Sequence, residues 1–134
     1  MITLLYAGLC AILVLILAAR VVRWRFAHRI GLGDGGDAEL LRRVRVHGNA
    51  IEYLPLCLIL LGGMELNGYP APLIQGFGIA LVLSRVAHAF GLSRSSGVSA
   101  GRFAGTMVTW LLMLTMAGFA IVGYVMQYYV PGGG

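Results

Sequence analysis

The sequence has little charge and no lysine. Only 11% of its 134 residues are charged, whereas 59% belong to the hydrophobic set, and the mean hydropathy is +0.86. A soluble domain carries roughly 25% charged residues, so this composition excludes an ordinary soluble protein and predicts one that lies in lipid. The length excludes a large enzyme of two domains. We therefore expect residues 1–134 to form a single membrane domain.

The patterns of several common functional sites are also missing. Cys10 and Cys57 lie in apolar runs without CxxC or Cys/His spacing, and the three histidines have no carboxylate at ligand spacing, so we predict no disulfide and no metal site. The GLGDGG segment lacks the GK[ST] of a phosphate loop and is interpreted as a turn. All ten basic residues are arginines in or beside apolar segments, which excludes a solvated basic arm and a nucleic-acid partner.

Long apolar segments dominate what remains. The uncharged run 2–19 approaches the roughly 20 residues that a helix needs to cross a bilayer. Breaks at GLGDGGDA, NGYPAP and SRSSGVSA predict helices at about 2–30, 38–67, 72–92 and 101–130. The expected fold class is an all-α integral membrane protein, a four-transmembrane-helix antiparallel bundle. The spacings Gly76-x-x-x-Ala80 and Gly101-x-x-x-Gly105 offer small faces for close helix contact.

The arginines predict how the chain is oriented. Seven of them cluster around the connection between the first two helices and three around that between the last two, while the opposite ends carry none. Arginine-rich loops remain in the cytoplasm. We therefore expect both termini to be periplasmic and the arginine-rich loops to be cytoplasmic.

A stripe of polar residues interrupts the second apolar segment. Arg45, Asn49 and Glu52 are spaced i, i+4 and i+7, so they share one helix face, and Arg42 extends the stripe by one turn. One interpretation is that Glu52 pairs with an arginine of a neighbouring helix and only fastens the two helices together. The alternative is a polar cleft, because a cation, an amide and an anion in sequence complement a zwitterionic, peptide-like ligand.

Two further segments add polar groups near the same end. Arg85 and His88, at i and i+3, lie on one face of the third predicted helix, and Arg102 opens the fourth. A histidine by itself is more often a packing residue than a ligand. With Arg85 one turn away and Glu52 available opposite, the set favours a shared site.

The segment Arg45-Val-His-Gly-Asn49-Ala-Ile-Glu52-Tyr53-Leu-Pro55 resembles the MAPEG family, the membrane-associated proteins of eicosanoid and glutathione metabolism. Arg85-Val-Ala-His88 is similar to the third helix of the prostaglandin E synthase branch, and Arg102 lies where that family has an arginine at the entry to helix four. GDGG ahead of this segment resembles a short bacterial subgroup, which implies the bacterial inner membrane.

The resemblance implies a MAPEG-like homotrimer with glutathione, as co-substrate, bound between subunits near the cytoplasmic face. Arg102 matches the catalytic arginine proposed to hold the thiolate, and Glu52 would take the ammonium of the γ-glutamyl group. The sequence departs from several eukaryotic members at Leu92, where they have a tyrosine. The full set of matched glutathione-binding positions is Arg45, Asn49, Glu52, Tyr53, Arg85, His88 and, less securely, Arg23.

The expected function is a microsomal-type glutathione transferase or peroxidase acting on lipophilic electrophiles or hydroperoxides, with membrane lipid as its surroundings. The protein would hold the thiolate and bring it close to a second substrate that arrives from the bilayer. Two alternatives are a scaffold that binds lipid or glutathione without chemistry and a small proton-coupled exporter that uses Glu52.

Overall fold

The protein is described by a computed structural model that defines the backbone of residues 1–94 and 100–129 and the side chains of residues 1–89 and 103–129. The described chain is helical and has no strand. Each helix contains a segment long and apolar enough to cross a membrane, which confirms the predicted fold class, and where helix ends differ from those expected they do so by one or two residues. The four helices are α1 (Ile2–His28), α2 (Ala38–Leu66), α3 (Ala71–Arg94) and α4 (Ala100–Tyr129).

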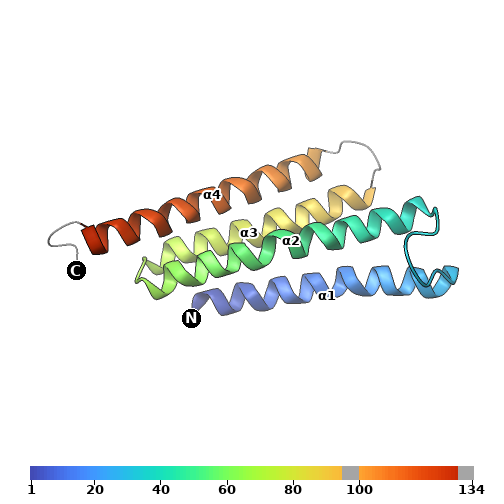
Figure 1. The fold of residues 1–134 in the computed structure, drawn as a ribbon, viewed down its shortest axis with the longest axis horizontal. Coiled ribbons are helices and arrows are strands. Elements are labelled where there is room, and N and C mark those ends of the chain that lie inside the picture. The colour runs from blue at the N-terminus through green and yellow to red at the C-terminus, as the bar shows by residue number, and fades with distance from the viewer. Residues whose placement is uncertain (95–99, 130–134) are drawn as a thin grey trace.

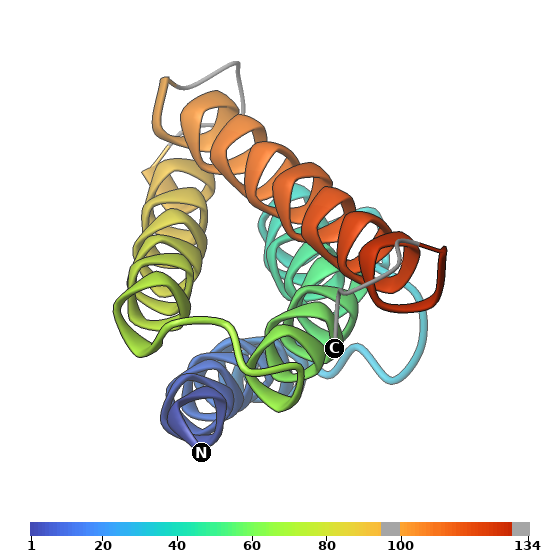
Figure 2. The same ribbon diagram turned by 90° about the vertical axis from the view of Figure 1, so that its left-hand side faces the viewer.

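The helices lie side by side along one long axis (Figure 1). The connection from α1 to α2, the end of α3 and the start of α4 share one end of the bundle, which we call the arginine-rich end. Figure 2 shows α1 and α4 on opposite sides of the pair formed by α2 and α3. In the described part of the chain, α2 and α3 each contact both outer helices, and α1 and α4 do not contact each other.

Side chains satisfy the exposed amides at two helix starts. Asp37 precedes α2, and its Oδ1 accepts hydrogen bonds from the amides of Glu39 at 2.8 Å and Leu40 at 3.0 Å. Glu65, near the end of α2, accepts hydrogen bonds from the amides of Ile2 and Thr3 in the first turn of α1. Free amide donors at a helix start need partners, especially in a membrane where water is scarce. Glu65 thereby ties the start of α1 to the end of α2, and Asp37, which also accepts from the Trp24 indole, ties the two helices at the other end.

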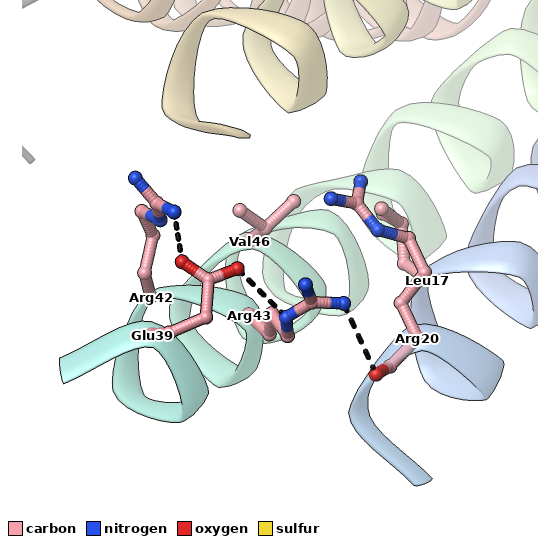
Figure 3. A pocket seen from close by; sticks show the side chains of 6 residues that line it. All are labelled: Leu17, Arg20, Glu39, Arg42, Arg43 and Val46. Atoms are coloured by element: carbon pink, nitrogen blue, oxygen red, sulfur yellow. Dashed lines mark hydrogen bonds and ion pairs between the residues drawn. The ribbon is translucent and has the colours of Figure 1, made fainter. Parts of the chain in front are cut away.

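A clamp at the arginine-rich end joins α1 to α2 (Figure 3). The Nε of Arg43 donates to Glu39 at 2.8 Å, its Nη1 lies 3.5 Å from the carbonyl oxygen of Arg20, and its guanidinium lies 4.3 Å from the Trp24 ring centroid. Trp24 in turn donates from its indole nitrogen to Asp37 at 2.8 Å. The cavity beside this clamp has a volume of about 10 Å³, which leaves room for about one water molecule and no substrate.

Helices α3 and α4 approach each other closely at Gly105. A Cβ at this position would lie 2.7 Å from the backbone oxygen of Ser84 and 2.8 Å from the Cβ of His88. One turn further along α4, Thr109 donates to the Gly105 carbonyl at 2.8 Å and lies 3.2 Å from the hydroxyl of Ser84. The missing side chain lets the two backbones meet, as small residues do in membrane helix pairs.

The other predicted small face behaves differently. No described atom outside its own helix lies within 4 Å of a Cβ built on Gly76, so this glycine makes no close helix contact within the described part of the chain. Gly78 has that role instead, because a Cβ there would lie 2.2 Å from the ring of the buried Tyr6 on α1. Spacing alone indicates which residues share a face but not which face meets a neighbour.

We predict that Gly105→Ala destabilises the bundle by about 1–3 kcal/mol, because the added methyl group meets backbone atoms that cannot turn away. The measurement is the thermal unfolding midpoint of the protein in one detergent. Gly76→Ala is the matched control, since the same methyl group enters open space on α3. Equal midpoints for the two variants would contradict the close contact.

We also predict an acid-sensitive step at Asp37. The Trp24 indole and the Leu40 amide, which both donate to this carboxylate, lower the pKa of Asp37 below its ordinary value. The stabilisation is therefore complete above the ordinary carboxyl pKa of about 4 and is lost as the pH falls through the lower folded value. Asp37→Asn should lower the unfolding midpoint at neutral pH, and the difference from the wild type should shrink in acid. Asp34→Asn, in the same loop, is the control, and a difference that stays constant with pH would contradict the assignment.

Candidate functional site

A cleft of about 700 Å³ opens on α2 in the half nearer the arginine-rich end. Ligand pockets commonly enclose roughly 300–1,000 Å³, so the cleft is large enough for a small peptide. Among the described side chains, helix α2 supplies most of the wall, and α3 and α4 contribute one residue each. The lining residues are Leu41, Val44, Arg45, Gly48, Asn49, Glu52, His88 and Thr106.

The predicted stripe on α2 forms one wall of this cleft. Arg45, Asn49 and Glu52 all line it, and the side chains of Arg45 and Glu52 are exposed. Both ion pairs within the described side chains are made by Glu39, so Glu52 is not sealed in a salt link between helices there. The arrangement favours the polar cleft over the interpretation in which Glu52 only fastens helices.

Arg42 does not extend the stripe as expected. It pairs with Glu39, three residues earlier on the same helix (Figure 3). Arg42 therefore lies beside the clamp to α1 and does not line the cleft. Because Glu39 also binds Arg43, one carboxylate holds two arginines away from the cleft. Arg45 is consequently the α2 arginine that remains available to a ligand.

Arg85 lies behind the cleft wall, inside the bundle. Its residue is only 2% exposed, and its Nη2 donates a hydrogen bond of 2.8 Å to the Oδ1 of Asn49. The Tyr53 ring centroid lies 5.9 Å from the guanidinium, while Nε and Nη1 find no hydrogen-bond partner among the described atoms. Since the Asn49 oxygen is occupied, the amide nitrogen is the part that Asn49 offers to a ligand. Arg85 therefore acts on the cleft through Asn49.

His88 is the α3 residue that reaches the cleft. It is 4% exposed and lines the wall beside Asn49 and Glu52. Arg85 and His88 are three residues apart, but Arg85 lies inside the bundle whereas His88 lines the cleft. Arg85 therefore contacts the cleft wall at Asn49, whereas His88 lines the cleft itself.

The other predicted site residues lie apart from this lining. Tyr53 is half-buried and faces Arg85, and Arg23 is an exposed residue near the end of α1; neither contributes to the cleft wall. Arg102 belongs to the first turn of α4, and its side chain lies outside the described residues. Thr106, four residues after Arg102, lines the cleft, so the α4 face that begins at Arg102 runs toward it.

Sequence reasoning missed Thr106 and Gly48. Thr106 could have been found by following the Arg102 face one turn further along the helix. Gly48 lies between Arg45 and Asn49 in the lining, and its missing side chain leaves the cleft floor open. No motif identified this glycine, because its effect depends on what the neighbouring helices leave uncovered.

A second hollow lies at the opposite end of the bundle between α2 and α4. It has a volume of about 390 Å³, and its polar groups come from residues such as Asn67, Tyr69 and Gln127. None of its described lining residues is charged. The cleft at the arginine-rich end is thus the better candidate for a charged ligand.

Comparison with known proteins gives a consistent result. A sequence model of the MAPEG family matches residues 3–122. The inner membrane protein YecN of Escherichia coli strain K12 is 37% identical to the chain over 116 residues, which cover 87% of each protein. The protein of the same name from Escherichia coli O6:H1 matches with the same identity and coverage.

Proposed function

The chain belongs to the MAPEG family, and from this premise we propose that it is a glutathione-dependent membrane transferase or peroxidase that acts on lipophilic electrophiles or hydroperoxides. One observation carries the proposal: Glu52 is exposed in an open cleft that Arg45 and Asn49 share. A carboxylate in an apolar span needs a reason to be there, and a cationic group on a bound ligand supplies one.

Glutathione fits this row of groups in charge and in order. It carries two carboxylates and one ammonium group, joined by peptide bonds. Glu52 binds the ammonium, the Asn49 amide nitrogen donates to a peptide oxygen, and Arg45 binds a carboxylate. The row from Arg45 to Glu52 is about 10 Å long at the rise of an α-helix, which suits an extended tripeptide. The surplus of arginine also attracts the net negative charge of this ligand from water.

The chemistry requires a thiolate. A free thiol with a pKa of about 8.5 is only a few per cent ionised at neutral pH. Arg102, at the start of α4, is proposed to stabilise the sulfur anion, and His88 and Thr106 complete the wall. The second substrate is an apolar electrophile that enters from the bilayer between helices, so the protein contributes proximity and a stabilised nucleophile.

The same proposal includes a homotrimer with a cleft between adjacent subunits near the cytoplasmic face. Among the described side chains, one chain provides the α2 wall and His88 and Thr106 from α3 and α4, and we propose that an adjacent subunit covers the remaining side. A neighbouring subunit that closes the cleft would also contribute side chains that do not line the cleft of their own chain. Arg23, exposed near the arginine-rich end of α1, is the residue we assign to that contribution.

We predict that Glu52→Gln weakens glutathione binding by roughly 10- to 100-fold, because a hydrogen bond to a charged group contributes about 1.5–3 kcal/mol. The measurement is calorimetric titration of detergent-purified protein with glutathione. Asp34→Asn is the matched control: it removes the same charge at the same end of the bundle but outside the cleft lining. Wild-type protein without saturable binding would overturn the proposal.

A second prediction separates an enzyme from a binding scaffold. Arg102→Gln should lower turnover of glutathione with chlorodinitrobenzene or a lipid hydroperoxide by roughly 10²–10³-fold, the usual effect of removing one group that stabilises a developing anion. Glutathione affinity should change little, and Arg102→Lys should retain part of the activity. The ultraviolet absorbance of bound thiolate should fall in parallel with turnover.

The outcomes assign different roles. A loss of binding equal to the loss of turnover would make Arg102 a binding residue and contradict thiolate stabilisation. Wild-type protein that binds glutathione without turnover on a broad panel of electrophiles and hydroperoxides would favour a scaffold that holds the ligand without chemistry.

A further inference from the structure

A third hollow, separate from the cleft, lies where α1 ends. Its volume is about 430 Å³, and it shares no lining residue with the cleft on α2. All of its wall comes from the last turns of α1 and the residues that follow. We call it the α1 cavity; its lining residues are Val22, Arg25, Phe26, Arg29, Ile30 and Gly31.

The two arginines of the α1 cavity have no carboxylate opposite them. Both ion pairs among the described side chains use Glu39, which binds Arg42 and Arg43. The acids of the chain are placed elsewhere: Asp34 in the loop after α1, Asp37 at the start of α2, Glu39 in the clamp, Glu52 in the cleft and Glu65 against the first turn of α1. Arg25 and Arg29 therefore put uncompensated positive charge into the α1 cavity.

Arg25 also presents a donor that lacks an acceptor. Its Nη1 is buried and has no hydrogen-bond partner among the described atoms. A buried donor on a charged group is unfavourable when left unpaired. An anionic oxygen bound in the α1 cavity would give the Arg25 guanidinium, which lines the cavity, an acceptor.

The backbone brings Arg29 to the same place under strain. Arg29 has φ 54° and ψ 37°, and it is the only residue other than glycine with positive φ in the described chain. The turn is closed by hydrogen bonds from the Arg29 amide to the Phe26 carbonyl at 3.4 Å and from the Ile30 amide to the Arg25 carbonyl at 3.0 Å. Glycine is the usual residue in this left-handed position at a helix end. An arginine in this position is less favourable for the backbone than glycine, and it puts a second positive charge in the cavity that Arg25 lines.

The remaining wall is apolar and open to the surroundings. Val22 is 48% exposed and Phe26 is 79% exposed, and because they are four residues apart they lie on the same side of α1. This side belongs to a membrane-spanning segment that ends at His28. Ile30, beyond the helix end, adds a third apolar residue to the wall. The α1 cavity thus combines two guanidinium groups with an apolar strip at the arginine-rich end of a helix that is long and apolar enough to cross a membrane.

We propose that the α1 cavity binds the headgroup of an anionic phospholipid. The phosphodiester oxygens accept hydrogen bonds from Arg25 and Arg29, in the forked geometry that guanidinium offers to phosphate. The acyl chains run along Phe26 and Val22 toward the bilayer interior. The apolar strip favours a lipid over free phosphate, which would use the arginines and leave that strip bare. This site is independent of the glutathione proposal, because the two sets of residues do not overlap.

The test uses the full-length protein in nanodiscs of phosphatidylcholine with spin-labelled phosphatidylglycerol or spin-labelled phosphatidylcholine as the probe. The wild type should hold the anionic probe more tightly than the zwitterionic one. Arg25→Gln and Arg29→Gln should each weaken binding of the anionic probe about fivefold, the usual effect of one arginine at a charged membrane surface. Binding of the zwitterionic probe should not change.

Arg29→Gly separates binding from folding. Glycine relieves the left-handed backbone strain, so the variant should unfold no more easily than the wild type in zwitterionic detergent, yet it should lose the same fivefold affinity for the anionic probe. Arg29→Lys, which keeps the charge, should recover much of that affinity.

Three results would overturn the lipid site. Unchanged preference for the anionic probe in the double variant Arg25→Gln, Arg29→Gln would remove it. An equal loss in Arg94→Gln, which takes one charge from the end of α3, would assign the effect to overall charge. Displacement of the anionic probe by millimolar inorganic phosphate would make this a site for free phosphate.

Discussion

The hydrogen bond from Arg85 to Asn49 is the interaction on which the candidate site depends. A guanidinium inside a membrane bundle is expensive unless its donors are satisfied, and this is its one described hydrogen bond, at 2.8 Å. The bond joins α3 to α2 at the wall of the cleft and decides which end of the Asn49 amide remains for a ligand. The cation thus supports the cleft wall from behind, while Arg45 and Glu52 in the same wall remain exposed.

A second constraint places the other walls. At Gly105 the backbones of α3 and α4 are close enough that a Cβ would overlap Ser84 and His88. Because α4 lies so near, Thr106, the next residue, reaches the cleft that His88 lines. The close contact and the buried arginine act on neighbouring turns of α3, so packing and polar pairing together fix how this helix is rotated about its axis.

The rotation of α3 about its axis could not be predicted from the sequence. Long apolar runs predicted the four spans, because a chain that crosses hydrocarbon has few alternatives to a helix. The i, i+4, i+7 spacing placed Arg45, Asn49 and Glu52 on one face, because helix geometry alone sets that relation. For Arg85 and His88 the spacing gave a shared side of α3 but not which of them points inward. The answer depends on contacts with α2 and α4, just as the choice between Gly76 and Gly78 depends on where Tyr6 lies.

Both proposed sites follow from the surplus of positive charge in the chain. The chain has ten arginines and five acids. Most of the acids near the arginine-rich end make contacts within the chain: Asp37 binds Trp24, and Glu39 binds two arginines. Exposed arginines that bind no acid of the chain are available to anions from outside. Arg45 lies in a cleft open to a soluble anion, whereas Arg25 and Arg29 adjoin an exposed apolar strip. The apolar residues beside each arginine, more than the charge itself, therefore decide whether its partner comes from water or from the bilayer.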